Sequence, residues 1–132
     1  MTQRNIDTMD VIVNKIANGV KLSKALEAVY EKRNVCIPLN KKYSEVELIN
    51  LGMCRRTTNS FLRAKIRTLG ELIVFCNNKK ITDIPGIGKD SGIEAFEFIL
   101  DYCWGNMEDD ERVAFLIDTV ERNEAHLRTE IA

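Results

Sequence analysis

This sequence has a single histidine and lacks closely spaced cysteines and long apolar runs. His126 is the only histidine, and the four cysteines, at positions 36, 54, 76 and 103, stand at least 18 residues apart. Zinc sites need several such ligands at short spacing, so the sequence predicts neither a metal site nor a cofactor. The cysteines are instead expected to be small, reduced residues of the core.

Membrane and catalytic signatures are missing as well. No apolar run approaches the roughly 18 residues that a membrane-spanning helix needs, and the polar N-terminus, MTQRNIDTMD, lacks the apolar segment of a signal peptide. These features predict a cytoplasmic protein that does not enter a membrane. The sequence also has no recognisable Ser/His/Asp or Cys/His set and no phosphate-binding loop of the GxxxxGK[ST] type. We therefore expect a protein that is not an enzyme.

Charge is nearly balanced over the whole chain but is unevenly distributed. The formal net charge is −1, while residues 105–132 hold three basic and eight acidic residues. Residues 52–67, in contrast, hold no acidic residue and five basic ones, namely Arg55, Arg56, Arg63, Lys65 and Arg67. This acid-free segment is either a solvated helix face or a local positive surface that suits an anionic partner.

The spacing of apolar residues predicts helices almost throughout. Asp7 is expected to cap a first helix, which Gly19 ends, and Ser23 is expected to open a second one. The segment Ser44–Glu47, S-E-V-E, has the pattern of a capping box at the start of a short helix. Further helices are expected within residues 55–66 and 68–78 and after Gly88.

A last helix is expected to begin at Asn106 and to carry one apolar stripe. The stripe consists of Val113, Leu116, Ile117, Val120, Leu127 and Ile131. Phe115 lies off this stripe, and Glu124 interrupts it, which disfavours a long coiled coil. We therefore expect this helix to dock on the body of the protein, on a partner, or on a second copy of the chain.

These elements predict an all-α protein in three segments. Residues 1–42 form an N-terminal helical pair and a connector, residues 43–104 form a compact multi-helix domain, and residues 105–132 form an acidic amphipathic helix. The N-terminal pair has the outline of a helix-turn-helix, although any helical hairpin shares that outline.

The segment ITDIPGIGKDSG, residues 81–92, has the pattern of a helix-hairpin-helix. Its two glycines, Gly86 and Gly88, allow positive φ and close approach of another molecule. Amides of such a turn, and of the first turn of the next helix, are able to hold a phosphate oxygen. Gly92 leaves room for the two helices to pack closely. The alternative is a tight turn in which the glycines only allow the backbone conformation of the turn and bind no ligand.

From Leu48 to about Leu100 the sequence resembles the C-terminal domain of the α subunit of bacterial RNA polymerase. The matching elements are Arg56, Asn59 three residues on, the segment 66–72 (I-R-T-L-G-E-L) and the segment 84–91 (I-P-G-I-G-K-D-S). The resemblance implies a compact helical domain that binds the minor groove of A·T-rich promoter DNA and docks onto transcription activators.

The resemblance also implies a set of DNA contacts. The corresponding positions here are Arg56 for the minor groove, Asn59 and Ser60 beside it, and Gly86, Gly88, Lys89 and Ser91 for the phosphates. Arg55 adds a second positive charge. Asp90 departs from the family, in which this position is usually basic, and its carboxylate repels a phosphate unless it turns away to cap the helix.

Two functions follow from these residues. The first is a DNA-binding or transcription-associated regulatory protein that makes weak, shape-dependent contacts and has RNA polymerase or a transcription factor as a partner. The second is a protein–protein interaction module that keeps the fold with little affinity for DNA and uses its terminal helices for the contact.

Overall fold

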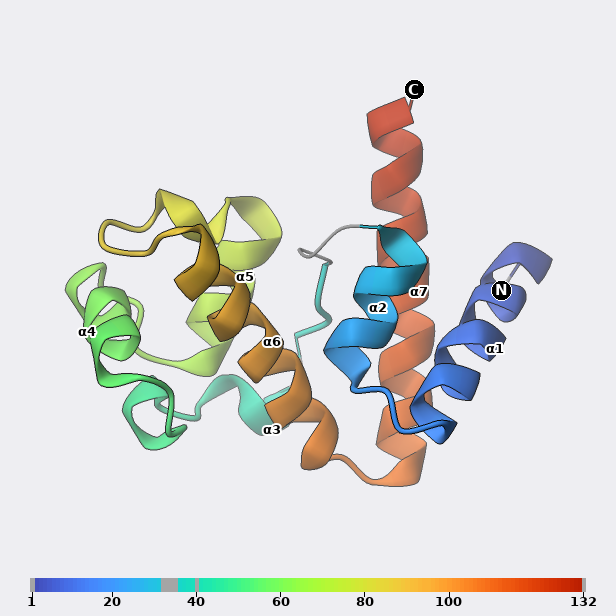
Figure 1. The fold of residues 1–132 in the computed structure, drawn as a ribbon, viewed down its shortest axis with the longest axis horizontal. Coiled ribbons are helices and arrows are strands. Elements are labelled where there is room, and N and C mark those ends of the chain that lie inside the picture. Colours follow the sequence, from blue (N-terminus) through green and yellow to red (C-terminus); the bar gives the residue numbers. More distant parts are fainter. Residues whose placement is uncertain (1, 32–35, 40, 132) are drawn as a thin grey trace. The chain divides into compact units, whose positions relative to one another are not determined.

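The computed structural model describes residues 2–31, 36–39 and 41–131, with side chains described as far as Glu124. The described residues form seven α-helices and no β-strand, which confirms the all-α fold (Figure 1). The chain divides into a terminal unit, Met1–Pro38 with Leu100–Ala132, and a central unit, Leu39–Ile99. Both ends of the chain thus belong to one unit, whereas the sequence suggested a separate segment for each.

The terminal unit is built from helices at the two ends of the chain. It contains α1 (Gln3–Ala17), α2 (Leu22–Tyr30), the last residues of α6 (Lys89–Gly105) and α7 (Asp109–Ile131). Helix α1 packs against both α2 and α7. Its core consists of the buried side chains Ile12, Leu22, Ala25, Leu26, Ile37, Leu100, Cys103, Met107, Phe115, Leu116 and Val120.

Helix α1 confirms the prediction for its C-terminus and contradicts the one for its N-terminus. Thr2 is the N-cap, because its hydroxyl accepts a hydrogen bond from the N–H of Asn5 at 3.2 Å. Asp7 lies inside the helix instead. At the other end Gly19 has a φ of +92°, and the amide of Val20 donates to the carbonyl of Lys15 at 3.0 Å. This is the left-handed ending that glycine favours.

Helix α2 begins at Leu22, one residue before the predicted Ser23, and its N-terminus is satisfied from a distant part of the chain. Asp101 of α6 accepts hydrogen bonds from the N–H of Ser23 at 3.2 Å and from its hydroxyl at 2.9 Å. Asp101 therefore caps α2 in place of a local N-cap side chain.

Helix α7 begins at Asp109 rather than at Asn106, and its buried face differs from the predicted stripe. Leu116 and Val120 are buried as predicted, but Val113 is 54% exposed and Phe115 is buried. Phe115 lies inside because its ring meets that of Trp104, with 6.3 Å between the centroids. Leu127 and Ile131 lie outside the described side chains.

Polar residues complete the buried face of α7. Asn123 and Glu124 are both buried. The Asn123 amide pairs with the backbone of Cys36, whose N–H donates to Oδ1 at 2.8 Å and whose carbonyl accepts from Nδ2 at 3.1 Å. The position at which Glu124 was expected to interrupt the stripe thus belongs to the interior.

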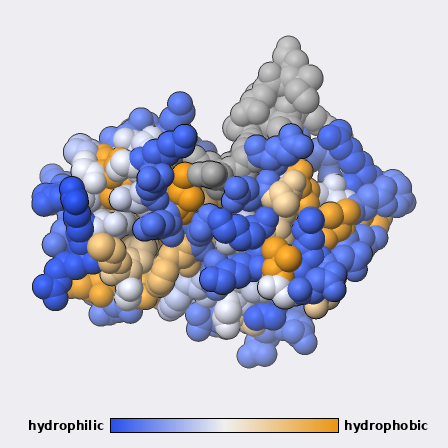
Figure 2. All heavy atoms as spheres, viewed as in Figure 1, coloured by the Kyte–Doolittle hydropathy of each residue, from blue (hydrophilic) through white to orange (hydrophobic). Residues whose placement is uncertain are grey.

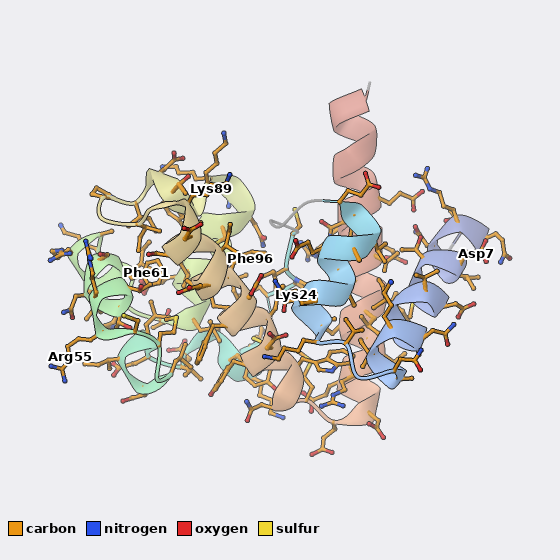
Figure 3. The ribbon with its side chains drawn as sticks, viewed as in Figure 1. Asp7, Lys24, Arg55, Phe61, Lys89 and Phe96 are labelled. Carbon is orange, nitrogen blue, oxygen red and sulfur yellow. The ribbon has the colours of Figure 1, made fainter. Side chains whose placement is uncertain are left out.

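The central unit contains short helices around a small core. In chain order these are α3 (Lys41–Ser44), the 3-10 helix η1 (Leu48–Asn50), α4 (Arg55–Arg63), α5 (Leu69–Asn78), the 3-10 helix η2 (Ile81–Asp83) and the first part of α6. Figure 3 shows Phe61 of α4 and Phe96 of α6 inside the unit, where both are fully buried.

The predicted capping box at Ser44–Glu47 does not form. Ser44 ends α3, and its hydroxyl donates to the carbonyl of Lys41 at 3.2 Å. Thr68 is the N-cap of α5 instead, because its hydroxyl accepts from the N–H of Glu71 at 3.2 Å. The true threonine–glutamate cap therefore lies further along the chain.

Two glycines allow elements of the central unit to pack closely. A Cβ atom at Gly92 would lie 2.7 Å from Cγ2 of Ile81, and one at Gly70 would lie 2.8 Å from Cβ of Ser44. The contact at Gly92 confirms its predicted role, because a larger residue would fit there only if the side chain of Ile81 moved.

Candidate nucleic-acid interface

Helix α4 places three of its predicted site residues on one face, together with Arg63, which was not among them. Arg56, Asn59, Ser60 and Arg63 are spaced i, i+3, i+4 and i+7, so they lie above one another on the helix surface. Arg55, Arg56, Asn59 and Arg63 are exposed, whereas the side chain of Phe61 is buried in the core. The helix is therefore fixed by its apolar side and presents three arginines to solvent.

The turn that follows η2 is held by apolar anchors. Ile84 and Ile87 are buried, and the amide of Ile87 donates to the carbonyl of Ile84 at 3.0 Å. Between them Gly86 has a φ of +90°, a conformation that residues with a Cβ rarely adopt. The observed geometry agrees with the predicted hairpin and leaves the backbone at Gly86 and Gly88 exposed.

Helix α6 starts directly after this turn, at Lys89. Lys89 and Asp90 are exposed, and Ser91 is half-buried. First-turn amides of a helix have no acceptor within the helix, and the helix dipole adds partial positive charge there. Asp90 occupies the same first turn, so its carboxylate competes with any anion for these amides.

Ser60 and Gly86 are the point at which α4 meets the turn. A Cβ at Gly86 would lie 2.8 Å from Oγ of Ser60 and 3.7 Å from Nη2 of Arg63. Ser60 is 1% exposed, donates to the carbonyl of Arg56 at 3.1 Å and accepts from Nη2 of Arg63 at 3.2 Å. Its position does not fit a direct contact with DNA, because the side chain is enclosed between the two elements.

The other predicted residues are spread over the surface of the central unit. Figure 3 shows Arg55 at the start of α4 and Lys89 at the start of α6, well apart from each other. Hydrophilic residues cover the edge of the unit formed by α4 (Figure 2).

The central unit holds ten basic and seven acidic residues, so its net charge is positive although that of the chain is negative. Among the arginines of α4, Arg63 is the one whose guanidinium lies beside Gly86, with Nη2 3.7 Å from the position of a Cβ there.

Cys54, immediately before α4, differs from the expectation of a buried cysteine. Cys54 is exposed, Cys103 is buried, and the remaining two are partly buried. The backbone N–H groups of Arg56 and Thr57 stabilise the thiolate and lower the pKa of Cys54. Burial has the opposite effect on Cys76 and Cys103, whose pKa values it raises to about 12. Sequence alone gave no sign of this difference.

A groove of about 690 Å³ runs along α5, apart from the Ser60–Gly86 junction. Its apolar lining includes Leu39, Val74 and Phe75, of which Leu39 is 50% and Val74 47% exposed. Nζ of Lys79 lies 5.8 Å from the centroid of the Phe75 ring. The groove thus combines exposed apolar side chains with basic ones.

Within the described part of the chain, no three His, Cys, Asp or Glu side chains are grouped so as to hold a metal ion. In the same residues, no helix combines the length and the apolar character that crossing a bilayer requires. No protein-family model matches the chain, and neither curated proteins nor solved structures give a significant match.

Proposed function

We propose that this protein binds DNA, without catalysing a reaction, through the exposed face of α4 and the hairpin before α6. The observation that carries the proposal is the junction of Ser60 with Gly86, which joins an arginine-bearing helix face to a glycine turn of positive φ. A groove-binding side chain and a phosphate-binding backbone are thereby held in one rigid arrangement.

Arg56 is the side chain proposed to enter the minor groove. A narrow A·T-rich groove has an enhanced negative potential that attracts arginine. Asn59 lies one helical turn further and is exposed, so its amide is proposed to contact the sugar–phosphate backbone. Gly86, Gly88, Lys89 and Ser91 are proposed to hold phosphates with backbone and side-chain donors.

A role in transcription is the second part of the proposal, with RNA polymerase or a transcription factor as the protein partner. It rests on the resemblance of Arg56, Asn59 and the segments 66–72 and 84–91 to the C-terminal domain of the polymerase α subunit. The small number of cations on the α4 face favours weak binding that depends on groove shape rather than tight binding to one sequence.

Binding to labelled duplexes at low salt tests the proposal. We expect the protein to prefer A·T-rich over G·C-rich duplex in fluorescence anisotropy, and Arg56→Ala to weaken binding about tenfold, the order expected for a groove contact. Arg122→Ala is the matched control, because Arg122 is an exposed arginine of the terminal unit that pairs with Asp118. The proposal fails if the wild type does not bind, or if both variants bind equally well.

A protein-interaction module is the second candidate, and the groove along α5 favours it. Leu39 and Val74 are exposed there. Three basic residues of the lining, Lys65, Arg67 and Lys79, outnumber its two glutamates, Glu45 and Glu71, so its net charge is positive. The occupant that fits is an amphipathic helix with acidic flanks on a protein partner. Val74→Asp should abolish capture of such a partner and leave DNA binding intact, whereas loss of both would point to misfolding.

A further inference from the structure

Arg63 is the one arginine of α4 whose guanidinium the structure places against the hairpin. Its Nη2 donates to Oγ of Ser60 at 3.2 Å and lies 3.7 Å from the position of a Cβ at Gly86. Arg63 belongs to the same face as Arg56 and Asn59, two helical turns from Arg56. Arg55, in contrast, lies at the opposite end of the helix.

The guanidinium of Arg63 retains donors for a ligand. Ser60 engages one nitrogen, and a guanidinium carries several N–H groups in a fixed planar fork. No carboxylate pairs with Arg63 among the residues that the structure describes. The side chain is exposed, so its free N–H groups face solvent beside the turn.

We propose that Arg63 and the backbone N–H groups of Gly86 and Gly88 in this turn hold one phosphate of the nucleic-acid backbone between them. The proposal rests on the proposed DNA-binding function and adds a contact that the resemblance does not supply. It also accounts for Asp90. A carboxylate in the first turn of α6 weakens the hold of that turn on an anion, and the cation of α4 restores the positive potential from the other side.

Ser60 acts as a positioning residue in this arrangement. Its hydroxyl is fixed by donation to the carbonyl of Arg56, and it accepts the hydrogen bond that orients Arg63. The absence of a Cβ at Gly86 provides the space for that hydroxyl. Ser60 therefore sets where the guanidinium lies, while Arg63 contributes the charge.

The salt dependence of DNA binding tests the role of Arg63. Each phosphate neutralised by a cation makes the slope of log K against log salt concentration more negative by about 0.9. We expect Arg63→Ala to bind A·T-rich duplex about tenfold more weakly at low salt and to reduce the magnitude of the slope by about one. Arg63→Lys should keep the slope and recover part of the affinity. Ser60→Ala should keep the slope with a smaller loss of affinity.

Three results would overturn the proposal. If Arg63→Ala keeps the affinity and slope of the wild type while Arg56→Ala binds DNA more weakly, the DNA-binding proposal is supported and the proposed role of Arg63 is wrong. The same holds if Arg63→Ala behaves like the control Arg122→Ala. If the wild type binds no duplex, both proposals fall. Circular dichroism of each variant ensures that a loss of affinity reflects the contact and not the fold.

Discussion

Lys65 shows how a single residue of the basic segment is constrained by its backbone. It follows the C-cap of α4 and has a φ of +65°, which is unfavourable for a residue with a Cβ. The amide of Ile66 donates to the carbonyl of Phe61 at 2.9 Å, and that of Lys65 donates to Leu62 at 3.0 Å. This is the glycine-type helix ending, formed here by lysine.

Replacement of Lys65 by glycine should therefore stabilise the protein. We expect Lys65→Gly to raise the free energy of unfolding by about 0.5–1 kcal/mol, because it relieves the left-handed strain. Urea titration followed by circular dichroism measures this change. Lys65→Ala, which removes the charge and keeps the strain, is the control and should not stabilise. Equal stabilities of the two variants would contradict the explanation.

Cys54 is expected to be the most reactive of the four thiols. Its thiolate is favoured by the N–H groups of Arg56 and Thr57, so its alkylation rate should level off at a lower pH than that of an ordinary cysteine. Cys76 and Cys103, with pKa values of about 12, should react slowly in the native protein at neutral pH. Mass spectrometry after brief treatment with iodoacetamide gives the order. Faster modification of Cys103 than of Cys54 would contradict it.

At the scale of elements, the caps and close contacts depend on residues that are distant in sequence. Ser23 and Asp101 are 78 residues apart, yet together they satisfy the N-terminus of α2. The sequence around Ser23 therefore holds no sign of Asp101 as the capping residue. Helix interiors, in contrast, were predicted well, because apolar spacing is a local property.

Asp101→Ala should destabilise the terminal unit by about 1–2 kcal/mol, since it removes an N-terminal cap with two hydrogen bonds. The single tryptophan, Trp104, lies in the same unit and reports its unfolding by fluorescence. Ser23→Ala should cost less, because the N–H of residue 23 still donates to Asp101. An Asp101→Ala variant as stable as the wild type would show that the cap has no net effect.

Gly92→Ala should destabilise the central unit by about 1–3 kcal/mol, since the added methyl group would overlap Cγ2 of Ile81 at 2.7 Å. Gly88 offers a matched control, because a Cβ there meets no atom within 4 Å. Gly88→Ala should therefore leave the thermal midpoint close to that of the wild type. If both substitutions had the same effect, the close contact at Gly92 would not explain it.

For the whole molecule, the near-zero net charge is the sum of two units whose net charges have opposite signs. The terminal unit holds nine basic and thirteen acidic residues, and the central unit holds ten and seven. A near-neutral chain therefore carries a positive unit, which the total charge would not suggest.

The candidate site was predictable as far as Arg56, Asn59 and the glycine turn. Arg63 was not, because its place beside Gly86 depends on how α4 packs against the turn.

The modest positive charge of the central unit predicts a modest dependence of DNA binding on salt. If Arg63 and Lys89 each neutralise one phosphate, the slope of log K against log salt concentration should be about −2. Anisotropy titrations over a range of salt concentrations give this slope. A slope near zero would indicate contacts without ion release, and a much steeper one would require further cations, such as Arg55, to contact phosphates.

The pairing of Asn123 with Cys36 has a practical consequence for altering this chain. The amide group of Asn123 bonds to both polar groups of the Cys36 backbone and to nothing in its side chain. At residue 36, Asn123 therefore contacts only the backbone. Any residue with a backbone N–H at this position can form both hydrogen bonds, whereas proline, which has no N–H, cannot. A variant that retains Cys54 as its sole exposed labelling site can therefore exchange Cys36 for serine or alanine and keep this connection.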